Sequence, residues 1–287
     1  MLNSRSVHVD RSRNLSSQSP KSRILEASWY DYPQYYDIAF QACTADEADF
    51  IEAACRKYCP FDAHHLLEPA CGSGRLVTEL ASRGYQLIGF DLSRPSLNYL
   101  RRRLMRRRLY ANTFAAEMSN FQLRRLADAA YCLSNTFRHL GTEKAARAHL
   151  QCIANSLRAG GIYVVGLNLL QLNGNTREAE ERWRRKRGNT TVAVRHRVLR
   201  TDVNCRLEHR RVVLLARSGS KELRLRHEFQ LRTYTPSQFR RLLASVPALE
   251  LCDVYHSCRD IDHPLKLNNE VTYGVLVLRR RNRGSHP

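Results

Sequence analysis

The residues between positions 68 and 91 have the types and spacing of a nucleoside-binding site. Glu68 precedes two glycines, Gly72 and Gly74, and Asp91 follows 17 residues after the second glycine. A glycine turn between a strand and a helix directs backbone N–H groups and the positive end of the helix toward a ligand. A carboxylate at the end of the next strand can accept hydrogen bonds from ribose hydroxyls. The pattern therefore predicts a ligand that contains adenosine.

The glycine spacing bears on which adenosine ligand is bound. Dinucleotide sites typically carry G-x-G-x-x-G, whereas Gly72-Ser73-Gly74 has no third glycine at that spacing. A nicotinamide-dependent oxidoreductase is therefore a distant alternative. A protein that binds an adenosine ligand without catalysis is another alternative, and the intact Gly72, Gly74 and Asp91 weigh against it.

Alternating strand and helix patterns are expected to position these residues. Helical spacing of apolar residues predicts helices at 75–83, from Pro95 onward, and from Thr142 to Leu157. Such alternation is typical of a doubly wound, mostly parallel α/β sheet, in which ligands bind beyond the carboxyl ends of the strands. Apolar runs predict strands at 65–67, 85–90, 110–116, 128–133 and 162–168. Polar residues stand at the ends of these strands, at Glu68, Asp91, Glu117, Asn135 and Asn168.

The segment after residue 168 changes to a period of two. Apolar and polar residues alternate over 192–198 and 223–231, and a turn at 218–220 joins two strands. We therefore expect residues 171–232 to form an antiparallel β insertion. His196 and His227 lie on its apolar faces, either as core histidines or as pocket-lining groups. Trp183 and the arginines near it either bind a substrate or form a solvated linker.

Two capping boxes and the terminal segments complete the expected organisation. Thr44 with Glu47, and Thr235 with Gln238, each have the spacing of a helix-starting capping box. The first of these helices is expected to run to about Tyr58. Residues 1–24 are predicted to be a disordered basic tail. The core is expected at 25–170 and 233–281, with 282–287 as a second tail.

The charge and the cysteines bear on partners and compartment. The formal net charge is +20, and such a field attracts polyanions. The excess is mostly arginine spread along the whole chain, so a solvated arginine-rich surface is favoured over a nucleic-acid-binding one. Nine irregularly spaced cysteines indicate a reducing, cytoplasmic compartment. Cys55 and Cys59, followed by His64 and His65, lack a CxxC pair, so we expect no metal site. No apolar run is long enough for a membrane span.

The stretch Glu68-Pro-Ala-Cys-Gly-Ser-Gly-Arg75 resembles the first motif of class I S-adenosylmethionine-dependent methyltransferases. The resemblance covers roughly residues 28–281. It implies a seven-stranded Rossmann-like sheet with S-adenosyl-L-methionine as the cofactor, and it makes the insertion after the fifth strand a substrate lid. Ala70 stands where many members have a glycine. By this likeness the cofactor is bound by the motif residues Glu68, Ala70, Gly72, Gly74 and Arg75, by Asp91 at the ribose, by Leu92, Glu117 and Met118 around the adenine, and by Ser134 near the methionine.

A second, more local resemblance concerns the acceptor. Residues 133–140, Leu-Ser-Asn-Thr-Phe-Arg-His-Leu, are similar to a stretch of glycine N-methyltransferase-like small-molecule enzymes, and residues 29–37 are similar to their tyrosine-rich entrance segment. The likeness implies that Asn135 faces the substrate and that Tyr36 lies over the cofactor. Tyrosine rings also suit a nearby sulfonium charge. His139 is a candidate general base, with a structural role as the alternative.

The resulting hypothesis is in-line transfer of a methyl group to a nitrogen or oxygen atom of a small molecule. An RNA or other nucleic-acid methyltransferase is the main alternative, because of the positive charge. No Asn/Asp-Pro-Pro-aromatic motif follows the fourth predicted strand, where Ser134-Asn-Thr-Phe137 stands instead. No oligomeric state is predicted.

Overall fold

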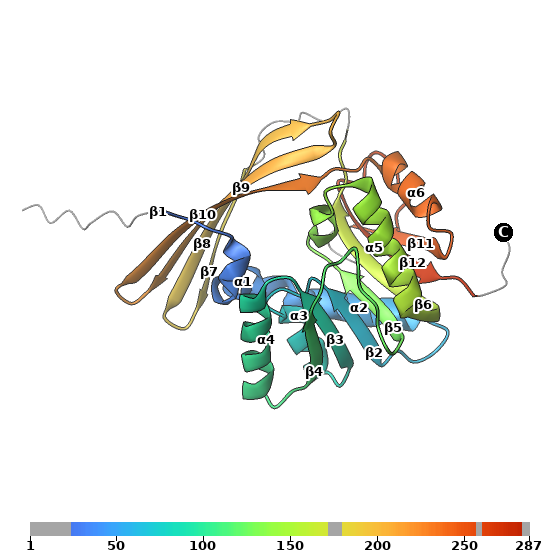
Figure 1. The fold of residues 1–287 in the computed structure, drawn as a ribbon, viewed down its shortest axis with the longest axis horizontal. Helices are drawn as coiled ribbons and strands as arrows, with labels where there is room; N and C mark the ends of the chain where they lie inside the picture. Colours follow the sequence, from blue (N-terminus) through green and yellow to red (C-terminus); the bar gives the residue numbers. More distant parts are fainter. Residues whose placement is uncertain (1–23, 172–179, 257–259, 283–287) are drawn as a thin grey trace, which may run out of the picture.

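The computed structural model describes residues 24–171, 180–256 and 260–282, which form two β-sheets (Figure 1). The larger sheet has seven strands in the order β11-β12-β6-β5-β2-β3-β4. All neighbouring pairs are parallel except those of β12, which runs antiparallel to both β6 and β11. The predicted doubly wound, mostly parallel sheet is confirmed. Its strands are β2 His65–Pro69, β3 Gln86–Asp91, β4 Ala111–Ala115, β5 Ala127–Cys132, β6 Leu157–Asn168, β11 Leu249–Tyr255 and β12 Tyr273–Arg280.

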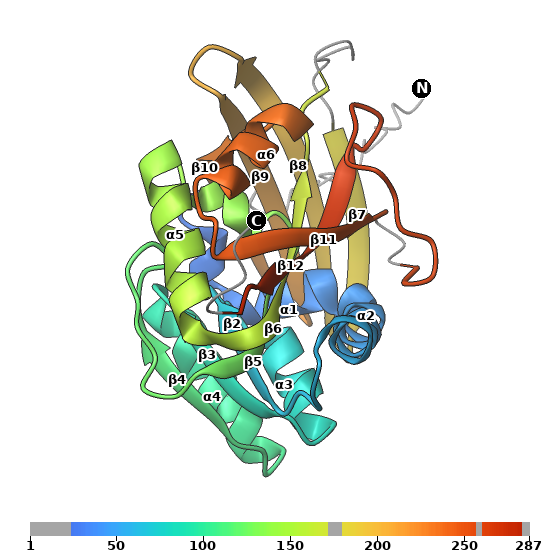
Figure 2. The ribbon, with the colours of Figure 1, turned by 90° about the vertical axis from the view of Figure 1, so that its right-hand side faces the viewer.

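The strands of this sheet carry apolar residues on both faces, and helices pack on both. The helices are α2 Thr44–Tyr58, α3 Arg75–Ser82, α4 Arg94–Arg106, α5 Glu143–Ser156 and α6 Pro236–Ala244. In β6, Ile162 and Val164 pack against α2, α3 and α4 on one face of the sheet. Tyr163 and Val165 pack against α5 and α6 on the other face. Figure 2 shows α5 and α2 on opposite sides of β6.

The smaller sheet projects from the body of the molecule (Figure 1). Its order is β1-β10-β9-β8-β7, with antiparallel pairs except that β1 runs parallel to β10. The predicted turn at 218–220 joins β9 to β10, with Gly219 in the left-handed region at φ 57°. The first described strand thus joins the inserted sheet. The strands are β1 Ile24–Glu26, β7 Glu180–Arg187, β8 Thr190–Asp202, β9 Leu207–Ser218 and β10 Lys221–Arg232.

The inner face of the smaller sheet packs on the segment that follows β1. This segment contains the 3-10 helix η1 (Trp29–Asp31) and the helix α1 (Pro33–Phe40). Val192, Val212 and Leu214 of the sheet are fully buried there beside Trp29. Trp183 belongs to the same cluster and donates a hydrogen bond to the Ala39 carbonyl at 3.1 Å, so it packs against α1.

Helix starts follow the sequence in two places and depart from it in one. Thr142 caps α5, and Thr235 forms the predicted capping box with Gln238 at the start of α6. The prediction of a capping box at Thr44 is wrong. The 3-10 helix η2 (Gln41–Cys43) runs directly into α2, so Cys43 is the N-cap and makes no side-chain cap. Within the described residues, no helix combines the length and the apolar character needed to cross a membrane.

Candidate functional site

A cavity of about 490 Å³ opens at the carboxyl ends of the central strands. Its walls come from the glycine turn after β2, the ends of β3 and β5, and the loop after β4. The segment before α1 and the 3-10 helix η3 (Thr136–His139) complete the wall. Eleven of the thirteen residues that the sequence marks as site residues line it: Tyr36, Glu68, Ala70, Gly72, Arg75, Asp91, Leu92, Glu117, Met118, Ser134 and His139.

The glycine turn uses left-handed backbone at three alternate positions. Ala70, Gly72 and Gly74 have φ values of 50°, 53° and 66°. A Cβ on Gly72 would meet nothing within 4 Å, whereas a Cβ on Gly74 would lie 2.2 Å from Cδ1 of Leu100. Gly72 therefore leaves room in the cavity. Gly74 is not part of the lining and instead lets α4 pack closely against the start of α3.

Asp91 joins the glycine turn to the start of α4. Its Oδ2 accepts a hydrogen bond from the Gly72 N–H at 2.7 Å, and its Oδ1 accepts one from the Ser93 N–H at 2.7 Å. Burial raises the pKa of this carboxyl above its usual value, although the backbone N–H groups oppose the shift. The carboxylate is thus held at the cavity wall by two short backbone contacts, where it can accept hydrogen bonds from a ligand.

Another part of the cavity wall contains Arg75 and Glu68. Arg75, in the first turn of α3, forms a buried ion pair with Glu47 of α2 and donates a hydrogen bond to Ser134 Oγ at 3.2 Å. Burial raises the pKa of Glu68 to about 8, and its Oε2 has no hydrogen-bond partner among the described residues. The Arg75 guanidinium and the unpartnered Oε2 of Glu68 suit the carboxylate and ammonium groups of an amino acid, and a bound ammonium would favour the ionised form of Glu68.

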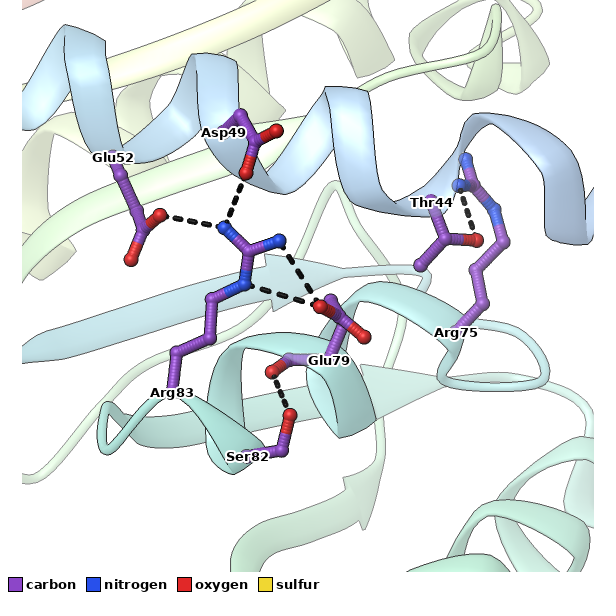
Figure 3. Close-up of polar contacts among 7 residues, drawn as sticks. All are labelled: Thr44, Asp49, Glu52, Arg75, Glu79, Ser82 and Arg83. Atoms are coloured by element: carbon purple, nitrogen blue, oxygen red, sulfur yellow. Dashed lines mark hydrogen bonds and ion pairs between the residues drawn. The ribbon is translucent and has the colours of Figure 1, made fainter.

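Helix α2 holds α3 in place beside this end of the cavity. Figure 3 shows Arg75 reaching toward Thr44, whose Oγ1 it contacts at 3.4 Å. Farther along, Arg83 donates to Asp49 and Glu52 of α2 at 2.6 Å each, and to Glu79 of α3 at 3.0 Å (Figure 3). The role of Glu47 as the partner of Arg75 was missed in the sequence, because that residue also fits a helix cap.

The segment that links β1 to α1, together with the start of α1, forms another part of the cavity wall. The Tyr30 hydroxyl and Nε2 of His139 are hydrogen-bonded at 2.8 Å, and Ser96 Oγ donates to the Tyr30 carbonyl at 2.8 Å. Tyr36 packs edge-on against Trp29 at 5.1 Å between ring centres, and burial raises its pKa to about 12. Burial raises the pKa of Tyr30 as well, so both tyrosines are neutral hydroxyl groups at neutral pH. The role of Tyr36 was predicted but that of Tyr30 was not, because the tyrosine-rich stretch does not distinguish among its tyrosines.

His139 is the last residue of η3 and Asn135 is the N-cap before it, and their side chains have different roles. Burial and the nearby Arg138 lower the pKa of His139 to about 4, so its imidazole is neutral at pH 7. The side chain of Asn135 is not part of the cavity lining, because its Oδ1 accepts a hydrogen bond from the Asn168 N–H at 2.7 Å. Asn135 thereby fastens η3 to the end of β6, and the structure does not bring it to the cavity.

The two histidines of the insertion surround an aromatic ring next to His139. Phe229 of β10 stacks on His227 at 5.0 Å, on His139 at 5.6 Å and on His196 at 6.2 Å between ring centres. Burial lowers the pKa of His196 to about 4 and also lowers that of His227. These uncharged rings of the inserted sheet pack against Tyr30 and His139, but they are not part of the cavity lining.

Comparisons with known proteins agree with this geometry. Residues 66–161 match the sequence family described as a methyltransferase domain. The predicted methyltransferase domain is therefore confirmed for the part of the chain that contains the glycine turn and Asp91. A search of curated proteins found no match.

Solved structures match over nearly the whole chain. A S-adenosylmethionine-dependent methyltransferase from Clostridium acetobutylicum has a TM-score of 0.71 at 16% identity, covering 88% of this chain and 99% of that one. A sugar N-methyltransferase from Streptoalloteichus has a TM-score of 0.68 at 19% identity, covering 98% and 99%. An amino pentose methyltransferase from Micromonospora echinaspora, solved with bound S-adenosylmethionine, has a TM-score of 0.62 at 23% identity, covering 88% and 92%. These matches confirm the fold of class I methyltransferases.

Proposed function

We propose that this chain is an S-adenosylmethionine-dependent methyltransferase that methylates an amino group of a small, sugar-like acceptor. The observation that carries the proposal is a single cavity with Asp91 on one wall and Glu68 with Arg75 on another. These side chains match the ribose, ammonium and carboxylate of the cofactor in kind. The match of residues 66–161 to a methyltransferase domain supports the same assignment.

The residues present fit this cofactor. The unpartnered, buried Oε2 of Glu68 supplies an acceptor for an ammonium group, and the open space beside Gly72 allows a ligand to approach the backbone. Leu92, Glu117 and Met118 form the wall that would take the adenine. When bound, S-adenosylmethionine supplies an activated methyl group on a sulfonium. The protein must then align the acceptor and exclude water.

Tyr30 and His139 are the groups that we assign to the acceptor. Their hydrogen bond, 2.8 Å long, places a neutral hydroxyl and a neutral imidazole at the cavity wall. With a pKa of about 4, His139 is too weak a base to hold a proton taken from an ammonium group. We therefore assign it the role of orienting an acceptor that already has a free electron pair, with proton release to water after transfer.

The proposed class of acceptor rests on the uncharged rings that line the cavity and on the described acceptors of two structural relatives. Tyr30, Tyr36 and His139 line the cavity with uncharged rings, which can cover the apolar face of a sugar ring. Two structural relatives are described as a sugar N-methyltransferase and an amino pentose methyltransferase. A neutral amine attacks a sulfonium methyl without prior deprotonation, which suits a site whose candidate base has a low pKa.

Three measurements test the proposal. Calorimetric titration with S-adenosylhomocysteine should give saturable binding, whereas NADH should give none. Incubation with radiolabelled S-adenosylmethionine and a panel of amino sugars, their N-acetylated forms and a short RNA duplex should label only the free amines. His139→Asn should lower kcat for the labelled amine and leave the affinity for S-adenosylhomocysteine within twofold. No binding of that ligand, or labelling of RNA alone, would refute the proposal.

A further inference from the structure

Four arginines gather where the inserted sheet meets the central domain, next to η3. They are Arg138 of η3, Arg206 of the turn between β8 and β9, Arg210 of β9 and Arg232 at the end of β10. Their ion pairs among the described residues go to only two carboxylates, Glu143 and Glu208. Two positive charges therefore remain in excess in a largely buried region, and buried charges usually have partners.

One half of this cluster is internally satisfied. Glu208 Oε2 accepts hydrogen bonds from Arg138 Nη2 at 2.6 Å and from Arg210 Nε at 2.8 Å. Arg138 also donates to the Arg232 carbonyl at 2.8 Å, and Arg210 contacts His196 Nε2 at 3.2 Å. This half needs no further ligand.

The other half has more donors than acceptors. Glu143 Oε2 accepts from Arg206 Nη1 at 2.9 Å and from Arg232 Nη2 at 3.1 Å, and the Gly141 carbonyl accepts from Arg232 Nη1 at 3.1 Å. Arg206 Nε, Arg206 Nη2 and Arg232 Nε are buried with no hydrogen-bond partner among the described residues. The Thr233 hydroxyl is buried without a partner as well, and the Tyr234 hydroxyl lies near Arg232, which opposes the rise of its pKa on burial.

These unpartnered groups lie around one ring and one helix start. The guanidinium carbons of Arg206 and Arg232 lie 5.0 and 5.7 Å from the centre of the Tyr234 ring. Glu143 is the first residue of α5, where the helix dipole favours negative charge. The Glu143 side chain is 38% exposed, and that of Arg206 is 21% exposed, so solvent reaches this half of the cluster.

We infer that Arg206, Arg232 and Tyr234 form a binding site for a phosphoryl group. Guanidinium groups present several N–H donors in a fork that suits the oxygens of a phosphoryl group. A single carboxylate oxygen of Glu143 already sits between the two guanidinium groups, and the remaining donors call for an anion with more oxygens.

The site is next to the proposed acceptor wall but does not depend on methyl transfer. Arg138, which bonds the Arg232 carbonyl, precedes His139 in the chain. The phosphoryl group therefore has two sources, a free phosphate ion or a phosphorylated sugar that extends to the cavity. Both sources share the same chemistry at Arg206 and Arg232.

The test compares matched arginine variants of the full chain. Inorganic phosphate is titrated calorimetrically at ionic strength held constant with sodium chloride. Arg206→Gln should weaken phosphate binding at least tenfold. Arg224→Gln is the control, because Arg224 lies on β10 of the same sheet and pairs with Glu222 at 2.7 Å outside the cluster. That control should leave phosphate affinity within twofold, and Glu143→Gln should raise it by removing the competing carboxylate.

The remaining arms identify the source and guard against misfolding. Glucosamine 6-phosphate that binds more tightly than inorganic phosphate would assign the phosphoryl group to a sugar, whereas equal affinities would assign a free anion. S-adenosylhomocysteine affinity, measured for every variant, should stay within twofold of the unmodified chain. Equal losses in Arg206→Gln and Arg224→Gln, or no saturable binding of either phosphate compound, would overturn the inference whether or not the chain methylates amines.

Discussion

Replacement of Asp91 by alanine should weaken cofactor binding without unfolding the protein. The carboxylate accepts two backbone hydrogen bonds of 2.7 Å at the cavity wall. In the proposed complex it would also accept from the ribose hydroxyls. Without this acceptor, those hydroxyls would be buried without a hydrogen-bond partner, which weakens the free energy of binding by about 1–3 kcal/mol. The dissociation constant for S-adenosylhomocysteine should therefore rise about 5- to 150-fold.

The pKa of Asp91 predicts the stability side of the same experiment. Because burial raises this pKa in the folded protein, the folded state disfavours the ionised form relative to the unfolded chain. The negative charge thus opposes folding at pH 7, and its removal offsets the loss of the contacts to Gly72 and Ser93. We expect the melting temperature of the ligand-free Asp91→Ala protein to stay within a few degrees of the unmodified chain.

Calorimetric titration and thermal melting separate the two effects. An Asp202→Ala variant serves as the control, since the Asp202 carboxylate also accepts a backbone N–H, that of Cys205 at 2.8 Å, but does not line the cavity. It should retain most of the affinity. An unchanged dissociation constant in Asp91→Ala would refute the ribose assignment, and a collapse of the melting temperature would show that Asp91 is mainly a structural residue.

Three further predictions concern stability. Gly74→Ala should destabilise the fold by at least about 2 kcal/mol in urea unfolding, because its Cβ would lie 2.2 Å from Leu100 and its φ is positive. Gly72→Ala should destabilise the fold less, because its Cβ would meet nothing within 4 Å. Equal losses of stability in the two variants would contradict this account of the turn. Arg83→Met should cost about 1–3 kcal/mol, because Arg83 joins Asp49 and Glu52 of α2 to α3, and an unchanged unfolding midpoint would contradict it. His149 has a pKa lowered to about 4 by burial, so its share of stability is complete above pH 6.5 and is lost as the pH falls toward 4. Melting curves of His149→Asn should lack that share of the acid sensitivity, and identical slopes in both proteins would exclude it.

Much of the fold follows from local sequence patterns. The strands of the central sheet, the helix that begins after Thr142 and the capping box at Thr235 are each encoded within a few residues, so periodicity and turn chemistry locate them. Asp91 and Gly72 also follow from sequence spacing, because adjacent parallel strands bring their carboxyl ends together.

The remaining features depend on contacts between distant parts of the chain. The register of β1 places Ile24 beside Arg224, and Tyr30 meets His139 across 109 positions. No local pattern specifies such pairs. Glu47 shows the same limit at shorter range, since its spacing from Thr44 fits a helix cap until the preceding 3-10 helix and Arg75 are known. Asn135 was selected from a motif, but its left-handed backbone at φ 66° turns the amide toward Asn168.

The path of residues 24–40 gives the protein a shared element between its two sheets. This segment pairs with β10 at one end, bonds His139 and Ser96 in its middle, and packs under the inserted sheet through α1. A ligand that shifts it from the cavity side must also shift its contacts with the sheet. If the bound cofactor changes the affinity for the acceptor through this segment, thermodynamic linkage requires the bound acceptor to change the affinity for the cofactor by the same factor. Each ligand is then expected to change the affinity of the protein for the other.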